Sequence, residues 1–416
     1  MTAGFALHWR GRAAVIAAAR DDGAMITVTN AERRARLALR HRLAPGHRAA
    51  TVEEAADAVV ALHATDPATI HLSAWARMDG MATADLDRAL YDARSLVKHM
   101  AMRRTLWVAP RATLAAIQAG ASARVAGRER RKLVADVERA GLHADGAAWL
   151  EAACAAVLGA LADGREATMA ELRDELPLLE GSISYGEGTS WAGQMPIGPR
   201  VLTVLSAEGR IVRASNIGGW NVSRPRWSAT RAWLGEEIEP LSEIDGVTLL
   251  TERWLRAFGP GTDRDVKWWL GSTLRLVREA LARLEAVEVA LEDGGRGWLL
   301  PDDLEPPAPV APWAALLPPL DPTTMGWAER DWYLGPHRSQ LFDTAGNAGP
   351  TAWWEGRIVG GWRQREDGAV ELQLLDDPGS EGIAALESEA ARLTEWFGGQ
   401  RVLMRFPSPL SKALAS

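Results

Sequence analysis

The chain has 416 residues, of which 47% are hydrophobic, and a net charge of −7. This length exceeds what one hydrophobic core usually serves, so we expect several modules. The single cysteine, Cys154, excludes a disulfide framework, and we interpret it as a buried apolar side chain in a reducing compartment. No apolar run approaches the roughly 20 residues that span a bilayer, and charged residues interrupt the N-terminus. These features predict a cytoplasmic protein with no membrane partner.

Charge is distributed unevenly along the chain. Residues 26–132 hold 18 basic and 10 acidic side chains, whereas residues 133–416 carry a net charge of −16. A basic N-terminal third can present one face to DNA phosphates, and the alternative is a set of ordinary solvated helix faces. Only four of the 47 basic residues are lysines, a bias that indicates a high-GC bacterial genome.

The first helices follow a segment that does not join their pattern. We expect residues 1–24 to be a disordered extension, and whether the native protein contains it stays open. An arginine-rich helix is predicted over about 30–42. A second amphipathic helix begins after Thr51 and runs through Leu62, because Ala55, Val59 and Leu62 form an apolar stripe.

A third helix is expected to leave from Pro67 and to expose Ser73 and Arg77. Another helix at about 83–93 and a strand at 105–108 follow it. Three helices, a basic turn and a strand form a plausible winged helix over residues 25–110.

Residues 111–146 are predicted to form one connecting helix. Five basic side chains lie on it within nine positions: Arg124, Arg128, Arg130, Arg131 and Lys132. Such a run is usually a solvated surface, but beside a DNA-binding module it is also a candidate for phosphate contacts.

The order helix, helix, helix, hairpin then occurs twice, over residues 147–229 and 245–301. A repeated order of this kind predicts tandem modules, and this order is that of a winged helix. Arg275, Arg278 and Arg283 on the last of these helices alternate with glutamates, so we expect them to pair on the surface rather than to contact DNA.

A proline-rich linker leads to residues 312–410. There strands alternate with turns, one helix covers about 380–397, and a last strand is expected at 402–406.

The most distinctive segment reads His63-Ala64-Thr65-Asp66-Pro67. The proline ring forces Asp66 out of the helical region, so residues 63–67, here called the elbow, place His63 and Thr65 at a helix end. A second segment, Met102-Arg103-Arg104-Thr105-Leu106, lies further along the chain.

These two segments resemble the winged-helix superfamily that contains the AlkZ/YcaQ-type bacterial DNA glycosylases. That family carries Gln-apolar-Gln or Gln-apolar-Asp before Asp-Pro, and a later Met-Arg-x-Thr-Leu. His63 and Thr65 stand at its two polar positions, and Trp107 replaces a family histidine. The resemblance implies an α+β fold with three tandem winged-helix modules and a C-terminal β-barrel with one helix. It also implies double-stranded DNA as the partner and excision of bulky alkylated purines, in DNA repair or in self-resistance to a genotoxin.

The elbow carries the candidate catalytic residues His63, Thr65 and Asp66. A neutral imidazole can act as a base or orient a water molecule, a hydroxyl can hold that water, and a carboxylate can stabilise positive charge on the sugar. Alternatively, Asp66 is a helix cap that accepts the N–H groups of residues 68 and 69. The candidate DNA-binding residues are Arg77, Lys98, Arg103, Arg104, Arg128 and Arg131.

No metal-ligand spacing and no glycine-rich phosphate loop is present, so we expect neither a metal nor a nucleotide cofactor. We expect a monomer. Two other functions stay open: a non-enzymatic winged-helix DNA-binding protein such as a transcriptional regulator, and a small-molecule sensor. Most of the 19 tryptophans are interpreted as core residues rather than base-stacking platforms.

Overall fold

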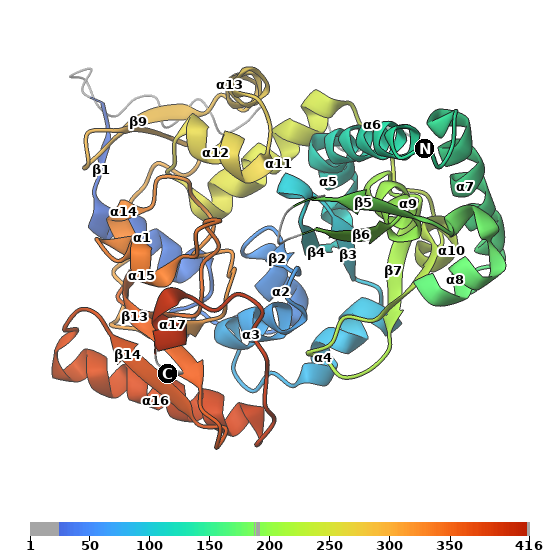
Figure 1. Ribbon diagram of the computed structural model, residues 1–416. Helices are drawn as coiled ribbons and strands as arrows, with labels where there is room; N and C mark the ends of the chain where they lie inside the picture. The colour runs from blue at the N-terminus through green and yellow to red at the C-terminus, as the bar shows by residue number, and fades with distance from the viewer. Residues whose placement is uncertain (1–24, 187, 189–191, 414–416) are drawn as a thin grey trace.

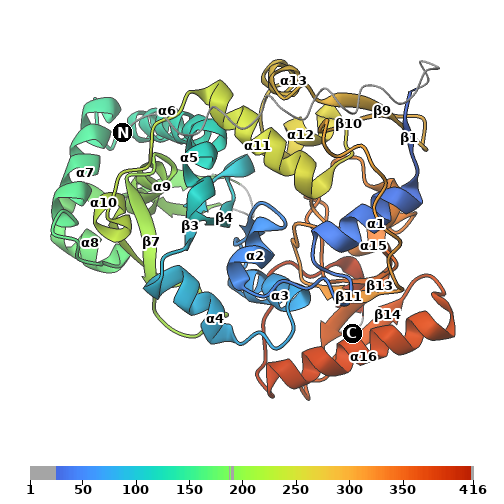
Figure 2. The ribbon, with the colours of Figure 1, turned by 180° about the vertical axis from the view of Figure 1, so that it is seen from behind.

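The computed structural model describes residues 25–186, 188 and 192–413; the expected extension at 1–24 lies outside them. The described chain is a mixture of helices and small sheets in two lobes (Figure 1). The elbow and its flanking elements lie between the lobes in both views (Figures 1 and 2). Within the described residues, no helix is both long and apolar enough to cross a membrane.

The N-terminal module holds a three-stranded antiparallel sheet of order β2-β4-β3. The predicted second helix ends early, because Val60 adopts a left-handed φ of 66° and Leu62 then pairs with Val108 as a strand. The expectation of one helix through Leu62 was therefore wrong. The elements are α1 (Asn30–Arg40), α2 (Val52–Asp57), β2 (Leu62–His63), α3 (Pro67–Arg77), α4 (Thr83–Asp87) with a π-helical turn η1 (Arg88–Asp92), β3 (Leu96–Met100), η2 (Met102–Arg104) and β4 (Leu106–Pro110).

The predicted connecting helix is present as a continuous helical run that ends at Arg139, short of the expected residue 146, and the second module follows it. This module has an additional hairpin, β5–β6, before its last helix, and its later hairpin consists of β7 and β8. The elements are η3 (Arg111–Thr113), α5 (Leu114–Ile117), η4 (Gln118–Ser122), α6 (Ala123–Arg139), α7 (Gly146–Ala160), α8 (Met169–Glu175), η5 (Pro177–Leu179), β5 (Ser182–Tyr185), β6 (Gly193–Pro196), α9 (Gly198–Ala207), β7 (Ile211–Asn216), β8 (Pro225–Ala229) and α10 (Thr230–Leu234).

The third module repeats the order of three helices and a hairpin. Its strands do not join the β7–β8 hairpin; instead β1 (Thr27–Val28), from the start of the described chain, pairs in parallel with β9. The N-terminal strand therefore pairs with residues that lie 263 positions later in the chain. The other elements are α11 (Glu243–Phe258), α12 (Asp263–Leu270), α13 (Leu274–Arg283), β9 (Val287–Leu291) and β10 (Arg296–Leu299).

The C-terminal region forms an open four-stranded antiparallel sheet of order β11-β12-β13-β14, so the expected closed barrel was wrong. Helix α16 packs on this sheet through buried Leu386 and Leu393. The strand expected at 402–406 is also absent, because the N–H of Val402 donates to the Gln364 side chain rather than to a neighbouring strand. The elements are β11 (Ala314–Leu317), α14 (Asp331–Leu334), α15 (Arg338–Leu341), β12 (Thr351–Trp354), β13 (Arg357–Gln364), β14 (Val370–Leu374), α16 (Gly379–Phe397) and α17 (Pro409–Ala413).

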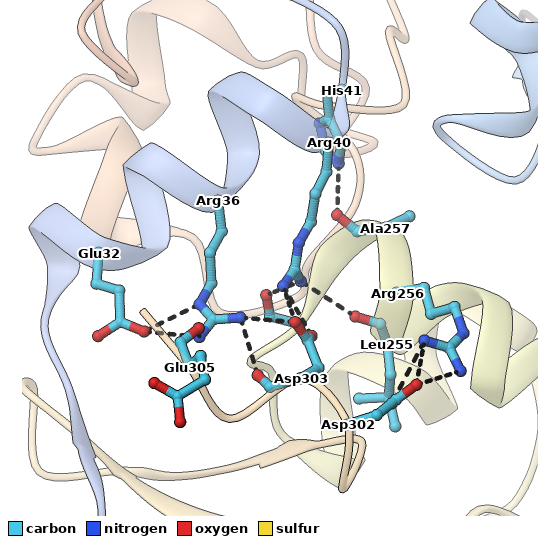
Figure 3. Close-up of polar contacts among 11 residues, drawn as sticks. Glu32, Arg36, Arg40, His41, Leu255, Arg256, Ala257, Asp302, Asp303 and Glu305 are labelled. Atoms are coloured by element: carbon cyan, nitrogen blue, oxygen red, sulfur yellow. Dashed lines mark hydrogen bonds and ion pairs between the residues drawn. The ribbon is translucent and has the colours of Figure 1, made fainter. Parts of the chain in front are cut away.

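Two arginines of α1, Arg36 and Arg40, form their polar contacts with other parts of the protein (Figure 3). Arg36 and Arg40 both donate to the carboxylate of Asp303 in the linker before β11, at 3.0 and 2.6 Å. Arg33 is buried, with its guanidinium 4.1 Å from the centre of the Trp332 ring. Part of the basic N-terminal third therefore holds the linker to α1 and is not available to a DNA backbone.

Hydrophobic packing unites the N-terminal module, the third module and the C-terminal sheet in one continuous core. The second module has a separate core of its own, which includes the buried Cys154. Burial raises the pKa of the Cys154 thiol to about 11, with a further contribution from Glu208. The interpretation of this cysteine as a buried apolar side chain is confirmed.

Candidate functional site

The elbow is held in place by the helix that follows it and by the C-terminal region of the chain. The buried Asp66 caps α3 by accepting the N–H of Ala68 at 3.3 Å, and its other carboxylate oxygen accepts the N–H of Arg405 at 3.0 Å. The N–H of Thr69 bonds to the Asp66 backbone carbonyl, so the predicted side-chain cap is confirmed for one of its two expected donors. Burial raises the pKa of Asp66, and the two hydrogen bonds oppose that shift.

His63 lies inside the protein, whereas Thr65 is exposed. The imidazole packs edge-on against Trp107 with ring centres 4.7 Å apart, and its Nδ1 has no hydrogen-bond partner among the described residues. Burial, together with the nearby positive charge of Arg103, lowers the pKa of His63 to about 3. The ring is therefore neutral near pH 7 and almost fully buried.

Arg77 is buried, so the expectation that α3 exposes it was wrong, and the same holds for Ser73. Its guanidinium forms a two-pronged ion pair with Asp321 at 2.9 and 2.8 Å, and Ser73 donates to the same carboxylate at 2.6 Å. A fully buried cation that is neutralised in this way cannot reach a phosphate of DNA. Arg77 therefore joins α3 to the segment after β11.

The two arginines of the second family-like segment have different surroundings. Arg103 adopts a left-handed φ of 55° and stacks at 4.0 Å over the ring of Trp268. Burial and the neighbouring Arg330 lower the pKa of Arg103 to about 10. Arg104 is exposed but pairs with Glu129 of α6 at 2.7 Å. Of the two, Arg104 is the better placed to reach a phosphate.

Lys98 on β3 is close to the elbow. Its ammonium donates to the hydroxyl of Tyr91 at 2.8 Å, and it lines the same narrow cavity as Ala64 and Pro67. Burial, with the positive charge of Arg213, lowers the pKa of Lys98 to about 8. The structure thus brings Lys98 beside the residues of the elbow, unlike Arg128 and Arg131, which lie on α6.

Arg128 and Arg131 are exposed on α6, and neither forms an ion pair within the described part of the chain. By contrast, the outward arginines of α13 pair with carboxylates, as predicted: Arg275 with Glu279, Arg278 with Asp263, and Arg283 with both Asp245 and Glu279.

Replacement of Arg128 and Arg131 by glutamine should weaken binding to duplex DNA and flatten its salt dependence, because each lost phosphate contact reduces the slope of log K against log salt by about 0.9. The matched control replaces Arg275 and Arg283, whose charges are already neutralised by glutamates, and should change affinity less. Fluorescence anisotropy over a salt series measures both. Equal losses in the two sets would contradict the assignment of α6 to the DNA-facing surface.

Two residues of this region carry no local signal in the sequence. Asp321, which neutralises Arg77, and Arg405, whose N–H binds Asp66, lie 244 and 339 residues from their partners. Neither belongs to a motif with recognisable spacing. Among the described residues, no group of three or more histidine, cysteine or acidic side chains is placed to hold a metal ion.

Known proteins match this chain over most of its length. The AlkZ-like family, described as "DNA glycosylase AlkZ-like", matches residues 56–396, which include the whole elbow. The structure of the Streptomyces sahachiroi DNA glycosylase AlkZ superposes with a TM-score of 0.72 and 19% identity, covering 92% of this chain and 99% of that one. No curated protein sequence matches significantly. Because the family match spans well over half of the chain, the protein belongs to the AlkZ-like DNA glycosylase family.

Proposed function

We propose that this protein is a monomeric DNA glycosylase that removes bulky alkylated purines from double-stranded DNA, in repair or in self-resistance to a genotoxin. The observation that carries the proposal is the elbow itself: an exposed hydroxyl, Thr65, directly precedes a buried carboxylate, Asp66, in the part of the chain that the family match covers. Hydrolysis adds water across the bond between the sugar C1′ and the purine, and leaves an abasic site and a free base.

Each residue of the elbow has a distinct proposed role. Positive charge develops on the sugar as the base leaves, and the Asp66 carboxylate stabilises it through space in surroundings of low dielectric constant. The Thr65 hydroxyl holds the attacking water. His63 is neutral and packs on Trp107, so its proposed role is to position the elbow. It does not act as the base that its residue type suggests.

DNA would be bound by the modules on either side. We propose that residues 25–110, 147–229 and 245–301 act as winged helices, joined by the connecting helix at 111–146, and that residues 312–410 hold the elbow from the C-terminal side. The two later modules share the order of three helices followed by a hairpin, in separate sheets. The exposed Arg128 and Arg131 on the connecting helix are the proposed phosphate contacts.

A second candidate, a protein that binds damaged DNA without excising the base, is favoured by one observation. Both carboxylate oxygens of Asp66 already accept backbone N–H groups, and His63 is turned into the core. A site built in this way can be a stable recognition surface without chemistry.

The test is release of abasic sites from duplex DNA treated with a bulky purine-alkylating agent. Asp66→Asn should lower the rate of base release by about 10²–10⁴-fold, the usual cost of losing a positioned catalytic group. Binding to undamaged duplex DNA should change little, because Asp66 is buried. The double variant His63→Gln with Thr65→Gln, which rebuilds the family's pair, should retain or raise the activity.

Asp66→Ser serves as the control, since serine preserves a helix cap but not the charge. It should match Asp66→Asn in rate, and it should lose some stability, because one hydroxyl cannot cap α3 and also accept the N–H of Arg405. A wild type that binds the damaged DNA but releases no base would instead support the second candidate. If the wild type is active and Asp66→Asn releases the base at the same rate, Asp66 has no role in the mechanism.

A further inference from the structure

Two cations from different modules meet beside the elbow, and neither is in direct contact with a carboxylate of the described residues. Lys98 lies on β3 of the N-terminal module and Arg213 on β7 of the second, and the two strands pack against each other (Figure 2). Both side chains line the narrow cavity that Ala64 and Pro67 close on the other side. Within the described residues, neither forms an ion pair, although most arginines of this chain do.

The existing contacts of these cations are neutral and incomplete. Lys98 donates to Tyr91, and Arg213 donates to the hydroxyl of Ser223 at a long 3.4 Å. The Nε of Arg213 is buried and has no hydrogen-bond partner among the described residues. Stacking of Arg213 on Trp227, at 5.1 Å between the guanidinium carbon and the ring centre, supports the guanidinium without neutralising it.

The nearest carboxylates are engaged elsewhere. Glu166 accepts hydrogen bonds from the backbone and side chain of Ser215, on the same strand as Arg213. Asp87 lies 3.6 Å from the Nε2 of His71, and its charge also acts on Lys98, without forming an ion pair with it. Burial lowers the pKa of Arg213 to about 10; burial and Arg213 lower that of Lys98, and Asp87 opposes this shift only in part. Partly buried like charges without a directly paired counterion are costly, so an anion between them would be favoured.

The size of the cavity limits what this anion is. The cavity leaves about 10 Å³ for the centre of a water-sized sphere, enough for about one oxygen atom but not for a base or a sugar. The Tyr91 hydroxyl adds a neutral donor, because burial raises its pKa and keeps it protonated. The arrangement suits one oxygen of a phosphate at the mouth of the cavity, with the rest of the group outside.

We propose that Lys98, Arg213 and Tyr91 form a clamp for a backbone phosphodiester of the DNA, next to the nucleotide that faces Thr65. The clamp rests on the proposed function, because it takes DNA as its ligand. The clamp lets the N-terminal and second modules hold the same phosphate. It thereby fixes the position of the DNA strand relative to the elbow. Arg213 would contribute to this contact although no motif in the sequence marks it.

The test uses a duplex oligonucleotide that carries a tetrahydrofuran abasic analogue, with affinity measured by fluorescence anisotropy over a salt series. Lys98→Gln and Arg213→Gln should each lower the affinity by about 10- to 100-fold, the range for a hydrogen bond to a charged group. Each should also reduce the salt slope by about 0.9. The control Arg226→Gln alters a nearby strand arginine that is already paired with Glu171, and should leave the affinity almost unchanged.

In a second experiment, a single uncharged methylphosphonate replaces each phosphate near the abasic analogue in turn. At one position this replacement should lower the affinity of the wild type as much as Lys98→Gln does. The same substitution should cost the two variants nothing further. The melting temperatures of the variants should not fall, because an uncompensated charge has been removed. This phosphate scan of the wild type also provides the test if a variant does not fold.

Several results would overturn the clamp. The first is that folded Lys98→Gln and Arg213→Gln variants bind the DNA as tightly as the wild type. The second is that no methylphosphonate position weakens the wild type while leaving the affinity of Lys98→Gln unchanged. Stabilisation of the wild type by inorganic phosphate, without any effect of methylphosphonates, would assign the cations to free phosphate instead of DNA. A wild type that does not bind duplex DNA would overturn the proposed function together with the clamp, whereas wild-type binding with unaffected variants would overturn the clamp alone.

Discussion

Acidification from pH 7.5 to pH 5 should destabilise this protein by about 6 kcal/mol, which is comparable to the whole stability of a typical domain. Three buried histidines account for this amount: His41 and His63, with pKa values lowered to about 3, and His99, with a pKa lowered to about 4. Burial also lowers the pKa of a fourth histidine, His71, which adds to the loss. Burial is the main cause of each shift.

The sign follows from proton binding in the two states. Between pH 6.5 and pH 4 the unfolded chain protonates these imidazoles and the folded protein does not, so stability is complete above pH 6.5 and is lost as the pH falls. At pH 5 each histidine contributes about 2 kcal/mol to the loss, since one pKa unit corresponds to about 1.4 kcal/mol. Asp66, whose pKa burial raises, offsets a small part of it.

Urea unfolding as a function of pH provides the measurement. The slope of the unfolding free energy against pH should correspond to about three protons between pH 6 and 5, and His63→Gln should lower it by about one proton. His47→Asn alters an exposed histidine and should leave the slope unchanged. A stability that is flat from pH 7 to 5 would show that these imidazoles are protonated in the folded protein.

Arg77→Met should destabilise the protein by about 3–5 kcal/mol, the cost of leaving a buried charge without its partner. Both Arg77 and Asp321 are fully buried, and their ion pair joins α3 to the segment after β11. Burial alone would raise the pKa of Asp321, but Arg77, Ser73 and the N–H of Thr323 hold it below its usual range. Removal of Arg77 reverses that balance.

The double variant Arg77→Met with Asp321→Leu separates a lost charge pair from lost packing. It should recover most of the stability, because replacing a buried pair by apolar side chains is often close to neutral. The measurement is urea unfolding of the two single variants and the double variant at pH 7. A double variant as unstable as the sum of the singles would show that the two residues act independently. Base release should follow stability in these variants, since the pair supports α3 directly behind the elbow.

Local patterns in the sequence determined much of the helical architecture. Capping and apolar periodicity predicted the start of α2 after Thr51 and the bounds of α16 to within one residue, and the order of three helices followed by a hairpin was found twice, as expected. These features depend on contacts between residues a few positions apart, where propensity and capping act. The same holds for the surface pairing of the α13 arginines. The resemblance of the two family-like segments predicted the family of the protein, and the family match over residues 56–396 confirms that prediction.

Only the tertiary structure decided the surroundings of the elbow. Leu62 and His63 extend a strand instead of a helix because β4, more than 40 residues later, supplies the ladder hydrogen bonds. Arg77 is buried because Asp321 neutralises it from the C-terminal region, and the backbone after α16 bonds to Asp66 instead of forming a strand. The free energy of burying a charge depends on partners that are distant in the chain, and a local pattern does not contain them. For the same reason Arg213 became a candidate only once β7 lay beside β3.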